Sequence, residues 1–485
     1  MQVQAWISLS AAIIYFLLII CFAVAIVMKR RPIGVSLAWL VLLFALPLAG
    51  MVAYLILGSQ LFGARRLRHT RNRHTGYYRW RILFGRLLSK QFGSESLAKD
   101  SRLYQFIENT MGMPALPGNH LQLYLNSFNV IDQIIADIAQ AKKSVSLQFY
   151  VWWPEGKCQL ITEALLQAVK RNIHCRILVD AVGSYYFLEH EDIIALKNAG
   201  VIVEAYCPVG PIRMFFERID IRNHRKIVII DEKIAWTGSF NMIDPSYFKQ
   251  NKNFGEWVDA MVRVEGPSAN MVNTVFLWDW QVATGCESKL FSKPPDGCFK
   301  YKGDTYLHVL PSDPRLNREN LHQALLTSIY ESKEEITITT PYFVPDDALF
   351  SALISTAKRG VKVCLILPKT TDSRLARFAS RSYYQPLLEA GAQILLFDSG
   401  LLHTKCVLVD NKITLFGSVN MDMRSVWLNM ELTLIIYSKS FADKIAKMIT
   451  QYKSKSVPLD LQDWKQRSFI RKIGESIAQL ASPLL

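Results

Sequence analysis

Two stretches of this chain carry the same reactive side chains in the same order, with every matched position offset by 179 residues. Each copy reads His-x-Lys, four residues, Asp, six residues, Gly-Ser, one residue, Asn. A single His-x-Lys carries little information, whereas the whole pattern found twice indicates a duplicated functional site. The matched residues are His224, Lys226, Asp231, Ser239 and Asn241 in the first copy, and His403, Lys405, Asp410, Ser418 and Asn420 in the second.

The spacing within each copy indicates which groups point together. The apolar, β-branched run after each histidine predicts a buried strand, and side chains two apart on a strand share a face, so each histidine points with its lysine. Gly-Ser then predicts a helix start, whose free backbone N–H groups attract anions. Two facing copies would form an anion pocket in which one imidazole attacks and the other protonates the leaving group. This chemistry suits a phosphodiester, with the lysines and asparagines stabilising the transition state.

The carboxylates near these copies fall into two groups. Asp231 and Asp410 complete the repeated pattern, but each lies where a strand enters a turn, which favours an architectural role over proton transfer. Glu431 and Asp259 directly precede later strands at equivalent positions of the two halves. We expect a carboxylate of this second group at the Nδ1 atom of each histidine, where it would fix the tautomer. Glu256 competes with Asp259 for this role.

The repeated pattern resembles the HKD motif of the phospholipase D superfamily. Three further blocks look like the bacterial cardiolipin synthases, and so do two apolar N-terminal segments and the Ser-Pro-Leu-Leu ending. The resemblance covers essentially the whole chain. It implies transfer of a phosphatidyl group from one phosphatidylglycerol to another, which gives cardiolipin and glycerol. The three blocks are Thr-Pro-Tyr-Phe-Val-Pro at 340–345, Gly-Leu-Leu-His-Thr-Lys at 400–405 and Met-Asp-Met-Arg-Ser at 421–425.

The resemblance also implies roles, although spacing alone does not fix which histidine attacks. In the family the first histidine usually attacks, so His224 would form a phosphatidyl-histidine, while His403 would protonate the departing glycerol and deprotonate the incoming one. The expected catalytic set is His224, Lys226, Asp231, His403, Lys405 and Asp410, and the expected phosphate-binding set is Ser239, Asn241, Ser418 and Asn420.

Other functions fit parts of the pattern. A hydrolase that releases phosphatidic acid, or an exchanger with another alcohol, would share the same motif residues. A nuclease of the same superfamily is disfavoured by the apolar N-terminal segments, and a non-catalytic scaffold by the intact residues of both copies.

Bulk composition agrees with an anionic partner at a membrane. The net charge is +15, the pI is near 9.3, and half of the residues are apolar. A basic chain of this kind attracts nucleic acid or an acidic membrane, and the apolar segments favour phosphatidylglycerol and other anionic lipids over nucleic acid. The eight cysteines form no CxxC pair, and no nucleotide-binding loop is present. We expect no cofactor and no metal, because the lysines supply the positive charge.

The N-terminal segments predict membrane insertion. Residues 6–28 and about 34–57 are each long enough to cross a bilayer as a helix. Three basic residues lie between them and six follow, so the larger cluster predicts a multi-pass protein whose later residues are cytoplasmic, although the basic loop argues the other way. The resemblance implies that the membrane is the bacterial inner membrane. A re-entrant hairpin is the alternative. The Arg-rich stretch 60–90 predicts a segment held to anionic lipid.

Alternating strands and helices predict two tandem phospholipase D-like α/β domains with mixed, mostly parallel sheets flanked by helices. One active site at the interface of the two halves follows from the duplication, and a homo-oligomer remains open. The expected parts are transmembrane helices at 1–60, a basic juxtamembrane linker region at 61–120, the first domain at 121–290, a linker at 291–304, the second domain at 305–460 and an amphipathic helix at 461–485.

Two further stretches could meet lipid. Residues 212–216 (Ile-Arg-Met-Phe-Phe) could form a membrane-dipping lip or a buried hairpin. The C-terminal run places Trp464, Ile470, Ile473, Ile477 and Leu480 on roughly one face, with basic residues among them. This pattern is typical of an interfacial amphipathic helix, and a helix docked on the protein body is the alternative.

Overall fold

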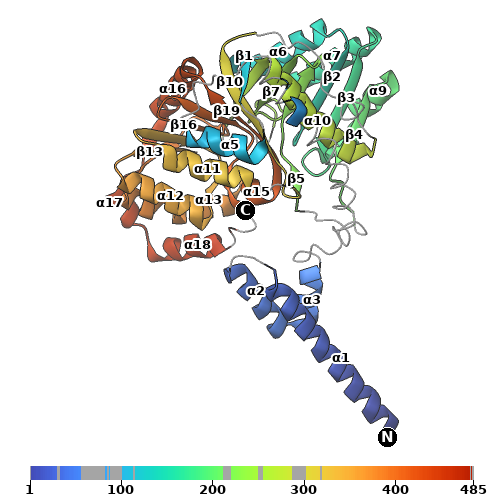
Figure 1. The fold of residues 1–485 in the computed structure, drawn as a ribbon, viewed down its shortest axis with the longest axis vertical. Helices are drawn as coiled ribbons and strands as arrows, with labels where there is room; N and C mark the ends of the chain where they lie inside the picture. The colour runs from blue at the N-terminus through green and yellow to red at the C-terminus, as the bar shows by residue number, and fades with distance from the viewer. Residues whose placement is uncertain are drawn as a thin grey trace. The chain divides into compact units, whose positions relative to one another are not determined.

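The computed structural model describes residues 2–29, 33–55, 82–84, 87, 101–112, 115–210, 220–248, 255–286, 302–316, 319–480 and 482. Contacts divide the chain into two compact units (Figure 1). Unit 1 comprises residues 1–72 and 209–220, and unit 2 comprises residues 73–208 and 221–485. The Arg-rich stretch 60–90, apart from residues 82–84 and 87, the linker 291–301 and the expected lip 212–216 lie outside the described residues.

Unit 1 is built from apolar helices: α1 (Gln2–Val27), α2 (Ile33–Ala45) and α3 (Pro47–Ala53). Within α1, Trp6–Val27 is long and apolar enough to cross a membrane, and it is the one such helix among the described residues. The second apolar segment does not form one unbroken helix over its described residues, because it breaks between α2 and α3. Pro47 lacks an N–H and restricts the residue before it, and Leu46 accordingly leaves the helical region, with φ −136° and ψ 73°.

The first half of unit 2 alternates strands and helices as the sequence predicts. Side chains of the loops set the helix starts; Asn126, for example, accepts hydrogen bonds from the N–H groups of Phe128 and Asn129. The elements are β1 (Leu116–Tyr124), α6 (Ser127–Gln140), β2 (Ser144–Phe149), α7 (Gln159–Lys170), β3 (His174–Asp180), α8 (Tyr185–Glu189), α9 (Glu191–Ala199), β4 (Ile202–Tyr206), β5 (Arg222–Asn223), β6 (Ile227–Ile230), β7 (Ile234–Gly238), β8 (Trp257–Val258), β9 (Met261–Glu265) and α10 (Pro267–Thr284).

The second half repeats this order and then adds C-terminal helices. Its elements are β10 (Thr305–Ser312), α11 (Asn320–Glu331), β11 (Glu335–Thr339), β12 (Phe343–Val344), α12 (Asp347–Lys358), β13 (Lys362–Pro368), α13 (Arg374–Ser382), α14 (Tyr384–Glu389), β14 (Gln393–Phe397), β15 (Leu401–Leu402), β16 (Cys406–Val409), β17 (Ile413–Gly417), β18 (Met421–Asp422), α15 (Met423–Trp427), β19 (Asn429–Tyr437), α16 (Lys439–Ser454), β20 (Ser456–Pro458), α17 (Leu461–Lys465) and α18 (Phe469–Leu480).

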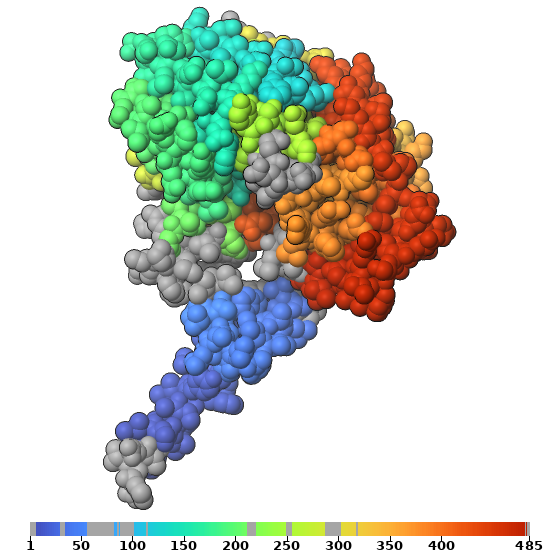
Figure 2. Space-filling model, turned by 180° about the vertical axis from the view of Figure 1, so that it is seen from behind, coloured from blue at the N-terminus to red at the C-terminus, as the bar shows by residue number. Residues whose placement is uncertain are grey.

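One sheet runs through both halves. Its strand order is β20-β14-β13-β11-β16-β17-β19-β10-β1-β9-β7-β6-β2-β3-β4, and β5 pairs with β19 off this path. The halves join where β1 pairs antiparallel with β10. Figure 2 shows the first half in green and the second in orange and red, packed side by side. Each half therefore contributes to one body, and the predicted duplication appears as two ends of a single sheet.

The sheet is mixed, as predicted, but antiparallel pairs outnumber parallel ones. In each half three neighbouring strands run parallel, as β2, β3 and β4 do, and the other pairs along the strand order are antiparallel, while β5 adds one short parallel pair with β19. The prediction of mostly parallel sheets is therefore wrong. The physical reason is the short turn after each motif strand, because a turn of a few residues can only reverse the chain.

Two details differ from the predicted boundaries of the first domain. β1 begins at Leu116, inside the stretch expected to be linker. The earlier helix α5 (Arg102–Met111) packs on α11 of the second half, and the backbone N–H groups of Arg102 and Leu103 donate to the carboxylate of Glu331. The chain before β1 is thus part of the second half's packing.

The core between the halves is centred on α10. Val272 and Phe276 of this helix are fully buried, in one cluster with Ile227 of β6 and Leu307 of β10. α10 lies against strands of both halves, and most of its residues are buried. This packing fixes the position of one motif strand relative to the other half.

Candidate active site

Each motif histidine is held by the backbone of the opposite half. β5, which precedes His224, pairs with the start of β19, and the His224 N–H donates to the Met430 carbonyl at 2.9 Å. In the same way β15, which precedes His403, pairs with β8, and the His403 N–H donates to the Val258 carbonyl at 2.9 Å. These two small parallel pairs cross the boundary between the halves and bring both histidines into one site.

Glu431 and Asp259 contact the two imidazoles, and each contact joins a histidine of one half to a carboxylate of the other. His224 Nδ1 lies 2.9 Å from Glu431 Oε1 and 3.0 Å from Oε2. His403 Nδ1 lies 2.7 Å from Asp259 Oδ1. A carboxylate accepts the Nδ1 proton and leaves the lone pair on Nε2, the atom that can attack phosphorus or carry a proton. Asp259, and not Glu256, is therefore the carboxylate at His403 Nδ1.

Burial shifts the pKa of both histidines. His224 and His403 are 7 % and 3 % exposed, and loss of water lowers the pKa of each to about 4 despite the neighbouring carboxylate. Lys226 and Lys405 lower them further. Both imidazoles are therefore neutral near pH 7, which is the form that a nucleophile needs.

The motif lysines are also buried and electrostatically coupled across the site. Burial lowers the pKa of Lys226 to about 7 and that of Lys405 to about 8, with mutual repulsion contributing to the shift of Lys226. Each ammonium donates to the carbonyl of its own histidine, Lys226 Nζ to His224 O and Lys405 Nζ to His403 O, both at 2.6 Å. A bound phosphodiester would restore their charge, because a nearby anion raises the pKa of a cation.

Burial alone would raise the pKa of Asp259, but His403 and Lys405 lower it below the ordinary value. Asp259 is therefore ionised and accepts the Nδ1 proton of His403.

An aromatic ring faces each imidazole: Tyr150 at 5.0 Å between centroids from His224, and Trp257 at 4.4 Å from His403. The rings limit the access of water to the histidines, which bears on the choice between an alcohol and water as acceptor.

The two motif serines support the carboxylates and the backbone. Ser418 Oγ donates to Glu431 Oε2 and accepts from the Leu432 N–H at 3.0 Å. Ser239 Oγ accepts from the Ala260 N–H at 3.0 Å, directly after Asp259, and its side chain helps to lower the pKa of Asp259. These bonds favour a positioning role for the serines over the phosphate binding that the sequence suggested.

The motif asparagines are buried beside the site. Asn241 Oδ1 accepts from the Val151 N–H at 3.3 Å, and Asn420 Nδ2 donates to Ser425 Oγ at 3.1 Å. The prediction that Gly-Ser opens a helix is wrong in both copies, because Ser239 and Ser418 lie in irregular backbone at the ends of β7 and β17. A short helix, α15, starts only at Met423, with Asp422 as its cap.

Asp231 and Asp410 lie at the far end of the motif strands, roughly 20 Å from the histidines at about 3.3 Å per residue. Each carboxylate accepts from three consecutive backbone N–H groups: Asp231 from residues 142–144, and Asp410 from residues 333–335. Both residues have positive φ, 53° and 49°, at the start of the tight turn. The structure does not bring them to the imidazoles, which favours an architectural role over the catalytic set in which they were placed.

The sequence analysis missed a buried ion pair behind the site. Arg225, 1 % exposed, donates to both carboxylate oxygens of Asp279 at 2.6 Å and to the carbonyls of Glu431 and Ser312. Arg225 therefore ties the strand of His224 to the strand of Glu431. One signal could have found it: Asp279 is the only charged residue of the apolar helix α10.

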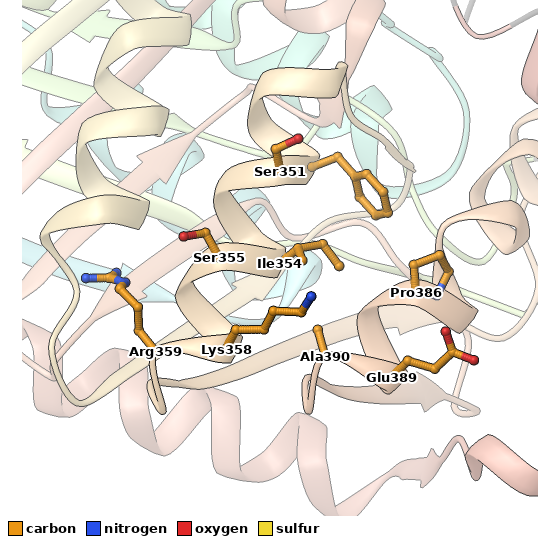
Figure 3. A pocket seen from close by; sticks show the side chains of 9 residues that line it. Ser351, Ile354, Ser355, Lys358, Arg359, Pro386, Glu389 and Ala390 are labelled. Atoms are coloured by element: carbon orange, nitrogen blue, oxygen red, sulfur yellow. The ribbon is translucent and has the colours of Figure 1, made fainter.

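One hollow lined by described residues lies away from the two motifs. It has a volume of about 730 Å³ and is lined by α12 and α14 and the turns that follow them (Figure 3). Lys358 extends toward Ala390 in this hollow. Glu389 pairs with Lys465, and the Arg359 guanidinium donates to the Ser332 carbonyl. None of its lining residues belongs to the two motifs.

Comparison with known proteins agrees with this geometry. A family model described as "Cardiolipin synthase, PLD-like domain" matches residues 134–280 and 325–453, and one described as "Phospholipase_D-nuclease N-terminal" matches residues 12–59. The phosphatidylserine synthase of Haemophilus influenzae has a similar fold, with a TM-score of 0.60 at 14 % identity over 79 % of this chain and all of that chain.

Curated relatives match over nearly their whole length. Cardiolipin synthase A of Cronobacter sakazakii is 40 % identical, with 97 % of each chain covered. Cardiolipin synthase A of Yersinia pseudotuberculosis is 38 % identical, over 100 % of this chain and 99 % of the relative. The chain belongs to the cardiolipin synthase family of phospholipase D-like proteins.

Proposed function

We propose that this protein is a cardiolipin synthase that joins two phosphatidylglycerols through a phosphatidyl-histidine intermediate. The observation that carries the proposal is the pair of crossed contacts, His224 with Glu431 and His403 with Asp259, each bond joining the two halves. Two oriented imidazoles in one site can share the work of a two-step transfer. Relatives named cardiolipin synthase A support the lipid substrate.

The proposed reaction proceeds in two balanced steps. In the first, His224 Nε2 attacks the phosphorus of one phosphatidylglycerol, and the bond to glycerol breaks as His403 gives its proton to the departing glycerol oxygen. In the second, His403 takes a proton from a hydroxyl of another phosphatidylglycerol, whose oxygen attacks phosphorus and releases His224. Lys226 and Lys405 stabilise the negative oxygens on phosphorus. The bound phosphodiester raises the pKa of His403 enough to hold the proton.

Apart from Asp231 and Asp410, which hold backbone turns, each residue expected from the sequence has a role in the proposed site. His224, His403, Lys226 and Lys405 meet the substrate, Glu431 and Asp259 orient the imidazoles, and Ser239 and Ser418 brace those carboxylates. Asn241 and Asn420 would complete the binding of the phosphate; Asn420 Oδ1 is buried without a hydrogen-bond partner among the described residues. We also keep the expected division into an N-terminal membrane region, two motif-bearing halves of unit 2 and a C-terminal helix.

The proposal includes an integral membrane enzyme of the bacterial inner membrane, with unit 2 on the cytoplasmic side. The apolar α1 supports membrane insertion. The larger number of basic residues after the second apolar segment supports the orientation, and α2 with α3 would form a second, kinked passage. Protease treatment of inverted vesicles tests the orientation, and protection of unit 2 in those vesicles would overturn it.

Product analysis tests the activity. Purified protein with phosphatidylglycerol in mixed micelles and EDTA is expected to give cardiolipin and free glycerol in equal amounts, identified by mass spectrometry. Phosphatidic acid without cardiolipin would overturn the transferase in favour of a hydrolase. Dependence on an added divalent metal would contradict the mechanism above, in which lysines supply the charge.

A further inference from the structure

The C-terminal helix α18 is docked with its polar side inward and its apolar side outward. Glu475 and Ala478 are its buried residues, 2 % and 5 % exposed. A helix on the surface of a soluble body normally buries its apolar stripe, so this orientation is the reverse of the usual one. The apolar side chains are the exposed ones: Phe469 75 %, Ile470 81 %, Ile473 43 %, Ile477 62 % and Leu480 82 %.

These five residues share one face of the helix. At 100° per residue they fall within an arc of about 100° centred opposite Glu475. The neighbouring helix α13 adds two exposed apolar side chains, Leu375 at 45 % and Phe378 at 43 %, which lie one turn apart. The ring of Phe378 lies against Gly474 of α18. The two packed helices therefore present one continuous apolar face, which we call the α13–α18 face.

A buried ion cluster holds α18 in this orientation. Glu475 accepts from Arg381 of α13 at 2.7 Å and pairs with Arg467 at 3.2 Å. Both guanidinium groups also lie over the ring of Trp464, at 4.6 Å and 4.0 Å from its centroid. The outward direction of the isoleucines is thus fixed by specific contacts to the body, and the helix is not an unattached tail.

The charge around the face is positive. Residues 374–382 and 464–480 contain seven Arg and Lys residues and one acidic residue, the buried Glu475. Arg374, Arg377 and Arg471 are exposed. An apolar helix face flanked by basic side chains is the pattern of a helix that lies in the interface of an anionic bilayer.

The face is also connected to the candidate active site. α13 begins two residues after Asp372, whose carboxylate accepts from the Tyr342 hydroxyl and acts electrostatically on Lys405 and Tyr150. The segment between β13 and α13 therefore runs from the site to the α13–α18 face.

We propose that the α13–α18 face docks on the surface of a bilayer that contains anionic lipid, and that this contact brings the site to its lipid substrates. The proposal rests on the proposed function for the purpose of the contact, but the contact itself can be measured without turnover. A second copy of the chain or unit 1 of the same chain are the competing occupants.

Photo-crosslinking in the full-length protein tests the contact directly. Ile477 is replaced by p-benzoylphenylalanine in a His224→Ala background, which keeps the lipid composition constant, and the protein is reconstituted in vesicles of phosphatidylglycerol and phosphatidylcholine. Ile194 on α9, which is 61 % exposed, gives the matched control position. We expect lipid adducts at position 477 and none at position 194. Crosslinks at position 477 to protein alone, or no adduct there, would overturn the proposal.

Charge and turnover give a second test. Arg377→Glu with Arg471→Glu is expected to reduce the lipid adducts at position 477, and an unchanged yield would overturn the part assigned to anionic lipid. Ile473→Ser with Ile477→Ser should lower turnover on vesicles about tenfold, which corresponds to about 1.4 kcal/mol, while leaving turnover in mixed micelles within about twofold of wild type. Ile194→Ser should change neither. Equal losses in vesicles and micelles would overturn the docking role, whereas absence of cardiolipin from the wild-type protein in both would overturn only the proposed function.

Discussion

Glu431 contacts His224 with both carboxylate oxygens and accepts a hydrogen bond from the Ser418 hydroxyl. Asp259 contacts His403 with one carboxylate oxygen. In the proposed mechanism each carboxylate holds its imidazole so that Nε2 faces the substrate. Because the carboxylates act through the histidines, they are positioning residues. Their contribution is therefore expected in the rate of the chemical steps more than in lipid binding.

Glu431→Gln is expected to lower kcat by about 10² or more with a small change in KM, because an amide no longer selects the Nδ1–H tautomer or stabilises an imidazolium. Asp259→Asn should have a similar effect through His403. Steady-state kinetics in mixed micelles measures both, with Glu256→Gln as the control, because Glu431 and Asp259 are the carboxylates at the two histidines. A kcat within a few-fold of wild type for Glu431→Gln would contradict the role.

The lowered histidine pKa values predict a pH-dependent stability. In the folded protein both imidazoles have a pKa of about 4, below the ordinary 6.5. Between these values the unfolded chain binds protons that the folded protein does not, so stability is lost as pH falls below about 6.5. The Tm in detergent should therefore fall between about pH 7 and about pH 5, and less so in a His224→Gln/His403→Gln variant. An equal fall in both proteins would contradict the prediction.

At the scale of single residues, the sequence predicted which residues gather at the site more accurately than it predicted the contacts of each one. Both carboxylate partners were found from their positions before later strands. The sequence did not predict that each histidine contacts the carboxylate of the opposite half. This arrangement depends on the pairing of β5 with β19 and of β15 with β8, and these strands are far apart in sequence. The serines were expected to bind phosphate. Their hydrogen bonds to the carboxylates and the backbone were not predicted, because these partners are brought close only by the fold.

At the scale of elements, the two short strand pairs between halves position the histidines. Their close approach depends on Gly400, which precedes β15. Gly400 has φ +110°, and a Cβ there would lie 2.4 Å from the Glu256 carbonyl oxygen. Any side chain at this position would push β15 away from β8, and with it His403 from Asp259.

Gly400→Ala is therefore expected to lower turnover by about 10²-fold, the cost that a displacement of about 1 Å can have. Gly391→Ala is the matched control, because Gly391 has a similar φ of +94° and no atom within 4 Å of its Cβ position. Both variants carry the same backbone strain, so a comparison of turnover and Tm separates strain from displacement. Equal turnover in the two variants would contradict the importance of the β8–β15 contact.

The alternation of strands and helices in both halves agrees with the prediction, because periodicity and capping are local signals. The mostly parallel sheet and the helix after Gly-Ser were wrong. Strand direction depends on the partner strand, and the Gly-Ser steps are needed for the close packing of β7 on β9 and of β17 on β19. Pro47, visible in the sequence, divides the second apolar segment.

For the whole molecule, the duplicated sequence folds as one sheet with one site. The predicted shared site agrees with a geometry in which each half supplies the histidine of one pair and the carboxylate of the other. The α13–α18 face is a second feature of the whole molecule. The periodicity of the C-terminal residues predicted an amphipathic helix but not which of its sides faces the body. That orientation depends on tertiary contacts such as those of Glu475 with Arg381 and Arg467.

The central claim is that the two histidines act as one unit. Turnover of phosphatidylglycerol to cardiolipin by His224→Ala, by His403→Ala and by the double variant tests it most directly. We predict that each single variant loses at least about 10²- to 10⁴-fold and that the double variant is little worse than the more severe single one, as expected for residues of one mechanism. Substantial activity in either single variant, or losses that multiply in the double variant, would contradict a single two-histidine site.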